Sequence, residues 1–241
     1  MDAEVISPKE FVAEASAFIA GRILAKQADG GVFRLSLCGG STPAPVYAAL
    51  AATPGIDWKR VLLTFGDERP VPPDHPQSNY RMVKETLLDA AGIAPENVLR
   101  IRGELPPVEA AEQCEARLRQ LATHAGEPCF VHDLTLLGMG DDGHTASLFP
   151  GTTALAETDR WVVANQVPQL DTWRVTVTYP LIAASREVLF LVNGANKHSR
   201  AQEVLAGDPA FPASAVTAGK VWWIIGGGLS QDDVKPGSPR P

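Results

Sequence analysis

Short apolar runs alternate with helix-forming segments along most of this chain of 241 residues, and this alternation restricts the fold more than any other feature. The runs are apolar almost throughout, as expected of strands that are buried on both faces. They lie at residues 32–37, 61–65, 98–101, 134–137, 161–164, 175–178, 188–192 and 221–225. Between them, helices are expected at residues 43–50, 78–90, 107–124 and 195–205.

Strands of this kind separated by helices predict the fold class. We expect an α/β protein with a three-layer, mostly parallel twisted sheet that has helices on both faces, as in Rossmann-like folds. Residues 1–229 are expected to form one domain, because no internal repeat or low-complexity linker divides them. Residues 230–241, rich in Pro, Asp and Gly, are expected to be a flexible tail.

The first helix has the clearest start signal in the sequence. Ser7 is predicted as its N-cap, with Pro8 at the first helical position and Glu10 completing a capping box. Apolar residues then recur with helical spacing until Gly30 and Gly31 end the pattern.

The charge balance excludes several classes of partner. The formal net charge is −7, and binding to nucleic acids or anionic membranes requires a basic face instead. The longest apolar stretch, residues 221–229, is too short to span a bilayer. The three cysteines are widely spaced without a C-x-x-C motif, and the N-terminus lacks the positive charge of a secretory signal. We therefore expect a cytoplasmic protein without disulfides that is a monomer or a weak homo-oligomer.

A glycine-rich segment follows the strand at residues 32–37. Gly39 and Gly40 allow backbone amides to approach a ligand, while Ser41 and Thr42 add hydroxyl donors before Pro43 begins a helix. These are the properties of a phosphate-binding loop, although a tight turn with a Ser/Thr cap has the same composition. The segment is not a Walker A loop, because no Gly-Lys-Ser/Thr sequence follows.

A second glycine-rich segment, at residues 138–143, matches G-x-G-x-x-G literally. We reject a dinucleotide site there, because Asp141 and Asp142 would repel a pyrophosphate. The segment is better interpreted as a tight loop that presents His144 as a proton-transfer group, with Asp142 placed to orient the imidazole. A surface histidine on a polar turn is the alternative.

Further charged residues follow other strands. Asp67 and Arg69 come directly after the strand at residues 61–65, while Arg174 and Lys197 adjoin two later strands. Because ligands of such sheets bind at the carboxyl ends of the strands, these residues are candidates for the same site, although each alone could be a surface charge. The remaining histidines have no metal-ligand spacing, so we predict no metal site.

Together, three segments form a far more specific pattern than any one of them. They are LCGGSTP at residues 37–43, FGDER and DHPQSNY within residues 65–80, and LGMGDDGHTASLFPG at residues 137–151. With these segments, residues 174–180 and FLVNGANK at residues 190–197, the chain resembles the 6-phosphogluconolactonase family over essentially its whole length. Cys38 and Gln77 stand where that family usually has Ser and Asp.

The resemblance implies that the chain hydrolyses a phosphosugar lactone, 6-phosphoglucono-1,5-lactone, in the oxidative pentose phosphate pathway without a metal or cofactor. It implies that His144 is the catalytic base and that Asp67 and Arg69 line the site. The groups implied to surround the phosphate are Gly39, Gly40, Ser41, Thr42, Arg174 and Lys197. Within that scheme, Asp142 is a candidate to orient His144, and Arg69 a candidate to stabilise the oxyanion.

Two other functions are compatible with parts of this pattern. Glucosamine-6-phosphate deaminases resemble the chain in the same loops, but they carry a Glu five residues after the His, where this chain has Phe149. A phenyl ring cannot transfer protons, which disfavours deamination. A non-catalytic sugar-phosphate-binding protein could keep the phosphate loop, but the intact Asp142-Gly143-His144 sequence argues against it.

Overall fold

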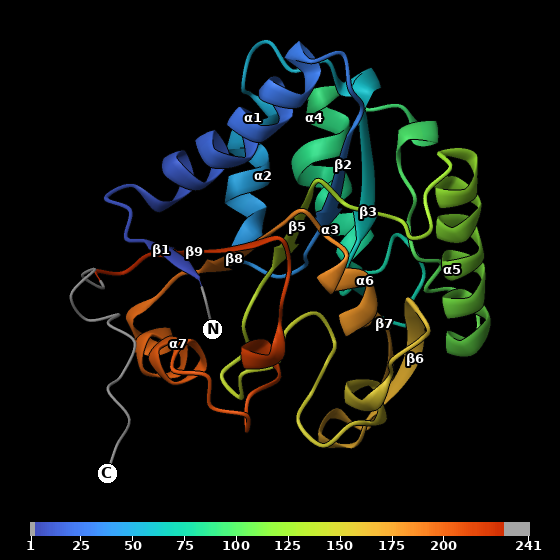
Figure 1. Cartoon of the computed structure of the whole chain (residues 1–241), viewed down its shortest axis with the longest axis vertical. Helices are drawn as coiled ribbons and strands as arrows, with labels where there is room; N and C mark the ends of the chain where they lie inside the picture. The colour runs from blue at the N-terminus through green and yellow to red at the C-terminus, as the bar shows by residue number, and fades with distance from the viewer. Residues whose placement is uncertain (1–2, 229–241) are drawn as a thin grey trace.

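The computed structural model describes residues 3–228, so the predicted tail at residues 230–241 lies outside the described part. Six parallel strands form the main sheet in the order β1-β9-β8-β5-β2-β3 (Figure 1). Their bounds are β1 Glu4–Ile6, β2 Phe33–Leu37, β3 Val61–Phe65, β5 Leu134–Leu137, β8 Glu187–Val192 and β9 Lys220–Ile225. The predicted parallel sheet is confirmed.

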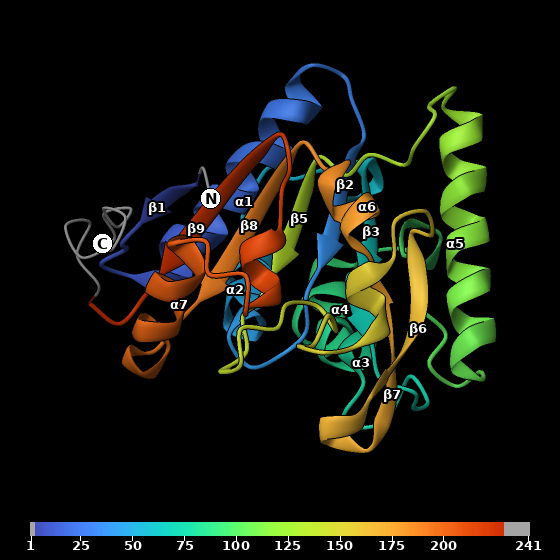
Figure 2. The ribbon, with the colours of Figure 1, turned by 60° about the horizontal axis from the view of Figure 1, so that its bottom comes forward.

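Helices cover both faces of this sheet (Figure 2). One layer contains α1 (Phe11–Ala28), α2 (Pro43–Ala51), and a continuous segment of α3 (Asn79–Val83), a π-helical turn (Lys84–Leu88) and α4 (Asp89–Ala91). The opposite layer contains α6 (Tyr179–Ala183) and α7 (His198–Leu205). Right-handed crossovers explain this division, because the chain moves one way along the sheet from β1 through β2 to β3, and the other way from β5 through β8 to β9.

A small antiparallel sheet lies beside the main one. It consists of β4 (Asp67–Glu68), β7 (Thr172–Val177) and β6 (Val162–Val167), in that order. The long helix α5 (Pro107–His124) packs against β6 and β7 at this side of the molecule (Figure 2). The strands predicted at residues 161–164 and 175–178 therefore exist, but they form a hairpin outside the parallel sheet.

The apolar runs of the parallel strands form the core. Every residue of β5 is buried, and the rings of Phe190 on β8 and Trp223 on β9 stack with centroids 4.0 Å apart. On the helical side, Ile19 and Ile23 of α1 and Leu50 of α2 are completely buried. Burial of such side chains stabilises the fold by roughly 1.5–3 kcal/mol each.

Two predictions about local structure are wrong. The helix α1 begins at Phe11 rather than at Pro8, and Ser7 and Glu10 form no capping box. The strand β1 pairs with β9 up to Ile6, so the next residues must turn before a helix can start. The predicted strand at residues 98–101 is only an isolated bridge between Val98 and Leu63.

The carboxylate of Glu14 performs the capping instead, accepting hydrogen bonds from the backbone N–H groups of Lys9 at 2.7 Å and Glu10 at 3.0 Å. It satisfies two of the unpaired donors at this helix terminus.

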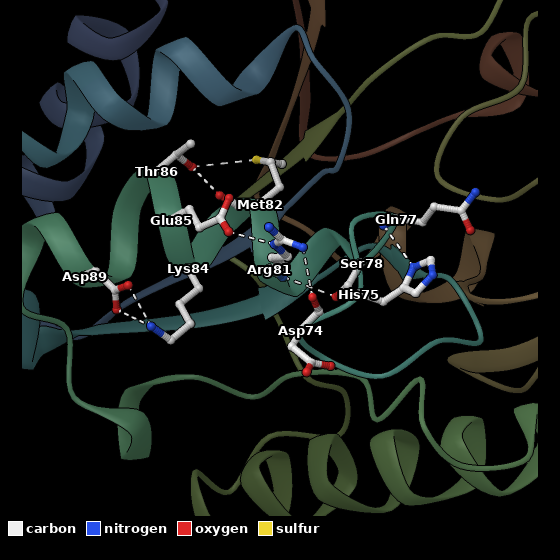
Figure 3. A network of polar contacts seen from close by, with 10 residues as sticks. All are labelled: Asp74, His75, Gln77, Ser78, Arg81, Met82, Lys84, Glu85, Thr86 and Asp89. Atoms are coloured by element: carbon white, nitrogen blue, oxygen red, sulfur yellow. Dashed lines mark hydrogen bonds and ion pairs between the residues drawn. The ribbon is translucent and has the colours of Figure 1, made fainter.

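A polar network joins the loop after β4 to the following helical segment (Figure 3). Ser78 is the N-cap of α3 and accepts a hydrogen bond from the backbone N–H of Arg81. The Arg81 guanidinium donates to the carbonyl oxygen of Asp74 at 3.0 Å and pairs with Glu85 at 2.7 Å. At the other end of the loop, Arg69 Nη1 donates to the carbonyl oxygen of Gln77 at 2.6 Å. This network holds the loop that carries Arg69.

Glu68 holds the same loop from its buried side. The side chain is 2% exposed, and its carboxylate accepts hydrogen bonds from Ser78 Oγ and from the backbone N–H groups of Arg69, Asn79 and Tyr80. Burial raises the pKa of Glu68, and the N–H donors only partly offset this effect. A buried carboxylate therefore ties the start of α3 to β4.

We expect Glu68→Gln to lower the free energy of unfolding by about 1–3 kcal/mol, because an amide nitrogen cannot accept the bonds that one carboxylate oxygen accepts now. Urea unfolding would measure the change. The exposed Glu85, in the same helical segment, provides the control, since Glu85→Gln should change stability by less than about 0.5 kcal/mol.

The pH dependence of this difference has a definite sign. The pKa of Glu68 is higher in the folded protein than its ordinary value of 4.5, so the folded state holds the proton more tightly than the unfolded chain does. The contribution of Glu68 is therefore greatest below pH 4.5 and falls as the pH rises through the folded pKa. An advantage over the Gln variant that grew with pH would contradict this account.

Candidate active site

The loops that follow β2, β3, β5 and β8 meet around a cavity of about 260 Å³. It lies where the chain reverses its direction along the sheet, between β2 and β5, which is the usual ligand site of such folds. The lining comes from residues 38–43, Asp67, Arg69, residues 138–140, His144, Ala146, residues 191–193 and Lys197. Segments that are distant in sequence are thus joined at one edge of the sheet.

The glycine-rich loop after β2 forms one wall of the cavity. Gly40 has a φ of +103°, which favours glycine, and a Cβ atom on Gly39 would lie 1.9 Å from Asn79 Oδ1. The helix α2 begins at Pro43, and the side chain of Thr42 makes no capping hydrogen bond. The loop therefore presents free hydroxyl groups and the N-terminus of a helix to the cavity, a suitable environment for an anion.

Asp67 forms the floor beside this loop. The side chain is 8% exposed, and it accepts hydrogen bonds from Ser147 Oγ at 2.6 Å and from Asn79 Nδ2 at 3.0 Å. These bonds connect β4 with the loop that follows β5 and with the start of α3. Both carboxylate oxygens are engaged, so Asp67 shapes the site and adds negative charge to its floor.

His144 lies at the mouth of the cavity with its ring fixed by its neighbours. The Nδ1 atom is 2.6 Å from Asp142 Oδ1, and the Phe149 ring stacks on the imidazole with centroids 4.0 Å apart and planes 24° apart. A Cβ atom on Gly140 would lie 2.2 Å from the imidazole, so only glycine leaves room for the ring there. When the Nδ1–H group donates its hydrogen bond to Asp142, Nε2 carries the lone pair of a base.

Two arginines contribute positive charge without a carboxylate partner among residues 3–228. The Nε atom of Arg69 is buried and has no hydrogen-bond partner, while Arg174 on β7 donates to the carbonyl oxygen of Trp173 at 2.9 Å. Burial, together with the nearby charge of Arg69, lowers the pKa of Arg174. Two unpaired guanidinium groups in one region favour an anionic ligand.

Arg174 and Lys197 lie in different hollows. Arg174 lines a second hollow of about 360 Å³, together with Asp142, Phe149 and Leu170. The two hollows share Asp67, Arg69, His144 and Ala146, so His144 lies at their junction. The cationic groups are therefore distributed over two hollows that both border His144.

Lys197 ends a 3₁₀ turn after β8, and its ammonium group forms an ion pair with Asp141. The hydrogen bond from Lys197 lowers the pKa of Asp141. From the sequence, Asp141 is expected only to repel a dinucleotide. No signal in the sequence indicated that Asp141 would pair with a residue so far along the chain.

The structure brings most of the predicted site residues together. The residues that line the first cavity are Gly39, Gly40, Ser41, Thr42, Asp67, Arg69, His144 and Lys197. Asp142 and Arg174 line the adjoining hollow. Sequence reasoning assigned no role to Asn79 and Ser147, although both lie within the quoted motifs. Within residues 3–228, no three His, Cys, Asp or Glu side chains are arranged to hold a metal ion.

A family model described as glucosamine-6-phosphate isomerases/6-phosphogluconolactonase matches residues 6–223. The chain belongs to this family. A 6-phosphogluconolactonase of Nostoc sp. is 38% identical over 200 residues, covering 81% of this chain and 82% of its own. The human 6-phosphogluconolactonase is 36% identical over 202 residues, covering 80% and 78% of the two chains.

The fold agrees with solved structures of the family. The crystal structure of 6-phosphogluconolactonase from Thermotoga maritima superimposes with a TM-score of 0.84 at 31% identity, covering 94% of this chain and 100% of that one. The enzyme from Trypanosoma brucei gives a TM-score of 0.76 at 29% identity, covering 93% and 96%. No helix in the described part of the chain is both long and apolar enough to cross a membrane.

We expect Gly140→Ala to reduce kcat for the reaction proposed below about 100-fold, because the added methyl group must displace the His144 ring. Gly21→Ala is the control. It adds the same group on the exposed face of α1, outside both hollows, where no atom lies within 4 Å of the new Cβ, and it should leave kcat near that of the wild type. Similar kcat values for the two variants would contradict the proposed packing of the imidazole.

Proposed function

We propose that this protein hydrolyses 6-phosphoglucono-1,5-lactone to 6-phosphogluconate, as the names of its relatives suggest. The observation that carries the proposal is the pair of His144 and Asp142 at the junction of two hollows that contain cationic groups. The reaction belongs to the oxidative pentose phosphate pathway, and we propose that the protein performs it in the cytoplasm.

The phosphate group of the substrate is the anchor in this proposal. The backbone amides of the loop at residues 39–42, the Ser41 hydroxyl and the Lys197 ammonium group bind it on one side of His144. Arg174 approaches from the adjoining hollow. These groups orient the lactone ring rather than react with it, and such orientation lowers the barrier of the chemical step by fixing the reacting atoms near each other.

His144 acts as a general base in the chemical step. Its Nε2 atom removes a proton from a water molecule, whose oxygen attacks the lactone carbonyl carbon. Asp142 accepts the Nδ1 hydrogen bond, and it thereby fixes the tautomer and stabilises the imidazolium that forms. The ring C–O bond then breaks, and the proton from His144 passes to the leaving oxygen.

Arg69 stabilises the negative charge that develops on the carbonyl oxygen. Arg69 lines both hollows and pairs with no carboxylate among residues 3–228, so its positive charge is available to a ligand. A fixed positive charge in a site shielded from water stabilises an oxyanion without reorganisation during the reaction. The reaction therefore needs only groups that this chain supplies.

The position of Phe149 argues against the deaminase alternative. Ring opening and proton transfer between adjacent carbons would need a second acid–base group beside His144, but the Phe149 ring is stacked on the imidazole there. An apolar ring in this position shields one face of His144 from water and cannot donate or accept a proton.

Two assays on one preparation test the function. We expect freshly prepared 6-phosphogluconolactone to release acid faster than its spontaneous hydrolysis, and glucosamine 6-phosphate to release no ammonia. Ammonia release without faster lactone hydrolysis would replace the proposal with deamination. If neither activity were detected, a sugar-phosphate-binding protein would be the better description.

We expect His144→Ala to lower kcat by about 10²–10⁴, the usual contribution of a general base, without loss of the fold. Steady-state rates on the lactone and thermal unfolding would be measured together. His124, an exposed histidine on α5, provides the control, and His124→Ala should retain the wild-type rate. A His144→Ala enzyme with most of its activity would exclude His144 as the base.

A further inference from the structure

Asp141 forms an ion pair with Lys197, whose ammonium group is one of the groups proposed to bind the phosphate of the substrate. The Lys197 side chain is 21% exposed and lines the cavity, whereas the Asp141 side chain is 79% exposed and lies in the adjoining hollow. A cation meant only for an incoming phosphate would gain nothing from a carboxylate partner. The pairing therefore requires a separate explanation.

Lys197 differs in this respect from the other cations of the site. Neither Arg69 nor Arg174 pairs with a carboxylate among residues 3–228. The positive charge of Lys197 is compensated before any ligand binds, and theirs is not. The hydrogen bond from Lys197 lowers the pKa of Asp141 further below its ordinary value, so the carboxylate competes for Lys197 as an anion.

The backbone around Asp141 is held independently of its carboxylate. Arg200 Nε donates to the Asp141 carbonyl oxygen at 2.7 Å, and the backbone N–H of Ala213 donates to the Gly143 carbonyl oxygen at 3.0 Å. The N–H of Gly140 also donates to the His144 carbonyl oxygen at 2.9 Å. The carboxylate can thus leave Lys197 while the loop that carries His144 keeps its conformation.

We propose that Asp141 is an exchangeable counter-ion that the phosphate of the substrate displaces from Lys197. This inference rests on the proposed function and adds a competing ligand to the phosphate site. An ion pair with one highly exposed partner contributes little to stability, so a phosphate dianion supported by backbone amides can replace the carboxylate. When the product leaves, Asp141 pairs with Lys197 again.

The exchange weakens the binding of every phosphorylated ligand, product included. Asp141→Asn removes the competing charge and should therefore tighten the binding of 6-phosphogluconate about two- to fivefold. Isothermal calorimetry with 6-phosphogluconate measures this without turnover. The KM for the phosphorylated lactone should fall in the same proportion, whereas KM for glucono-1,5-lactone, which has no phosphate, should stay the same.

Two further variants separate this exchange from a general effect of charge. Glu203 lies on α7 and pairs with Arg200 rather than Lys197, so Glu203→Gln removes a nearby negative charge without freeing the ammonium group. It should leave the affinity for 6-phosphogluconate unchanged. In a Lys197→Ala background, Asp141→Asn should also have no effect, because the group for which the two anions compete is gone.

Each outcome decides the proposal. Tighter binding that requires Lys197 supports it. Tightening of equal size in the Lys197→Ala background, or in Glu203→Gln, would overturn it in favour of a simple charge effect. Unchanged binding in Asp141→Asn would also overturn it. Weaker binding would overturn it as well, because Asp141 would then be positioning Lys197 for the phosphate.

Failure of the proposed function would look different. A wild-type protein that neither hydrolysed the lactone nor bound 6-phosphogluconate would remove the basis for both statements. A wild-type protein that did both, with an Asp141→Asn variant of unaltered affinity, would leave the lactonase function intact and exclude the exchange alone.

Discussion

Two adjacent buried carboxylates, Asp67 and Glu68, hold the active-site region together. Glu68 turns toward the start of α3 and accepts three backbone N–H groups and a hydroxyl, while Asp67 turns toward the cavity and accepts bonds from Asn79 and Ser147. Burying charge in this way is costly unless each oxygen is satisfied, and here each one is. These hydrogen bonds fix the geometry of the site, because the loops that carry Arg69, Gly39 and His144 all contact Asp67, Glu68 or their direct hydrogen-bond partners. Loss of one carboxylate would disturb several catalytic groups together.

The position of the imidazole depends on three neighbours of different character. Asp142 fixes one ring nitrogen, Phe149 covers one face, and Gly140 leaves the space that a larger residue would fill. The remaining nitrogen is then the only free polar atom of the ring, so the same contacts that restrain His144 also support its proposed role as the base. Phe149 has a second effect, since it fills the place where a neighbouring acid would permit a different reaction. The choice between hydrolysis and isomerisation on one scaffold can therefore depend on the residue beside the base.

Much of this arrangement could be predicted from the sequence, because it depends on periodicity and on motifs that are local. The predicted strands at residues 61–65 and 134–137 and the helix at residues 107–124 have the bounds found in the structure. The errors concern contacts between distant segments. The pairing of β1 with β9 moved the start of α1 away from Ser7, and the return of the chain after β3 created the short strand β4. The roles of Asn79, Ser147 and Asp141 depend on partners far along the chain, so no local pattern could reveal them. Likewise, the sequence grouped Arg174 with Lys197, but the fold places them in different hollows that share His144.

The separation of the cations has a physical consequence for catalysis. A phosphate dianion and a developing oxyanion both require positive charge, and a single cluster of cations would bind the substrate without distinguishing its two ends. Lys197 and the N-terminus of α2 border the first cavity, Arg174 borders the adjoining hollow, and Arg69 borders both. Partial compensation of Lys197 by Asp141 keeps that end from holding the product too strongly, since the product keeps the phosphate and gains a carboxylate. Arg69, which is proposed to stabilise the oxyanion, has no carboxylate partner among residues 3–228, so its positive charge remains available where negative charge would appear during the proposed reaction.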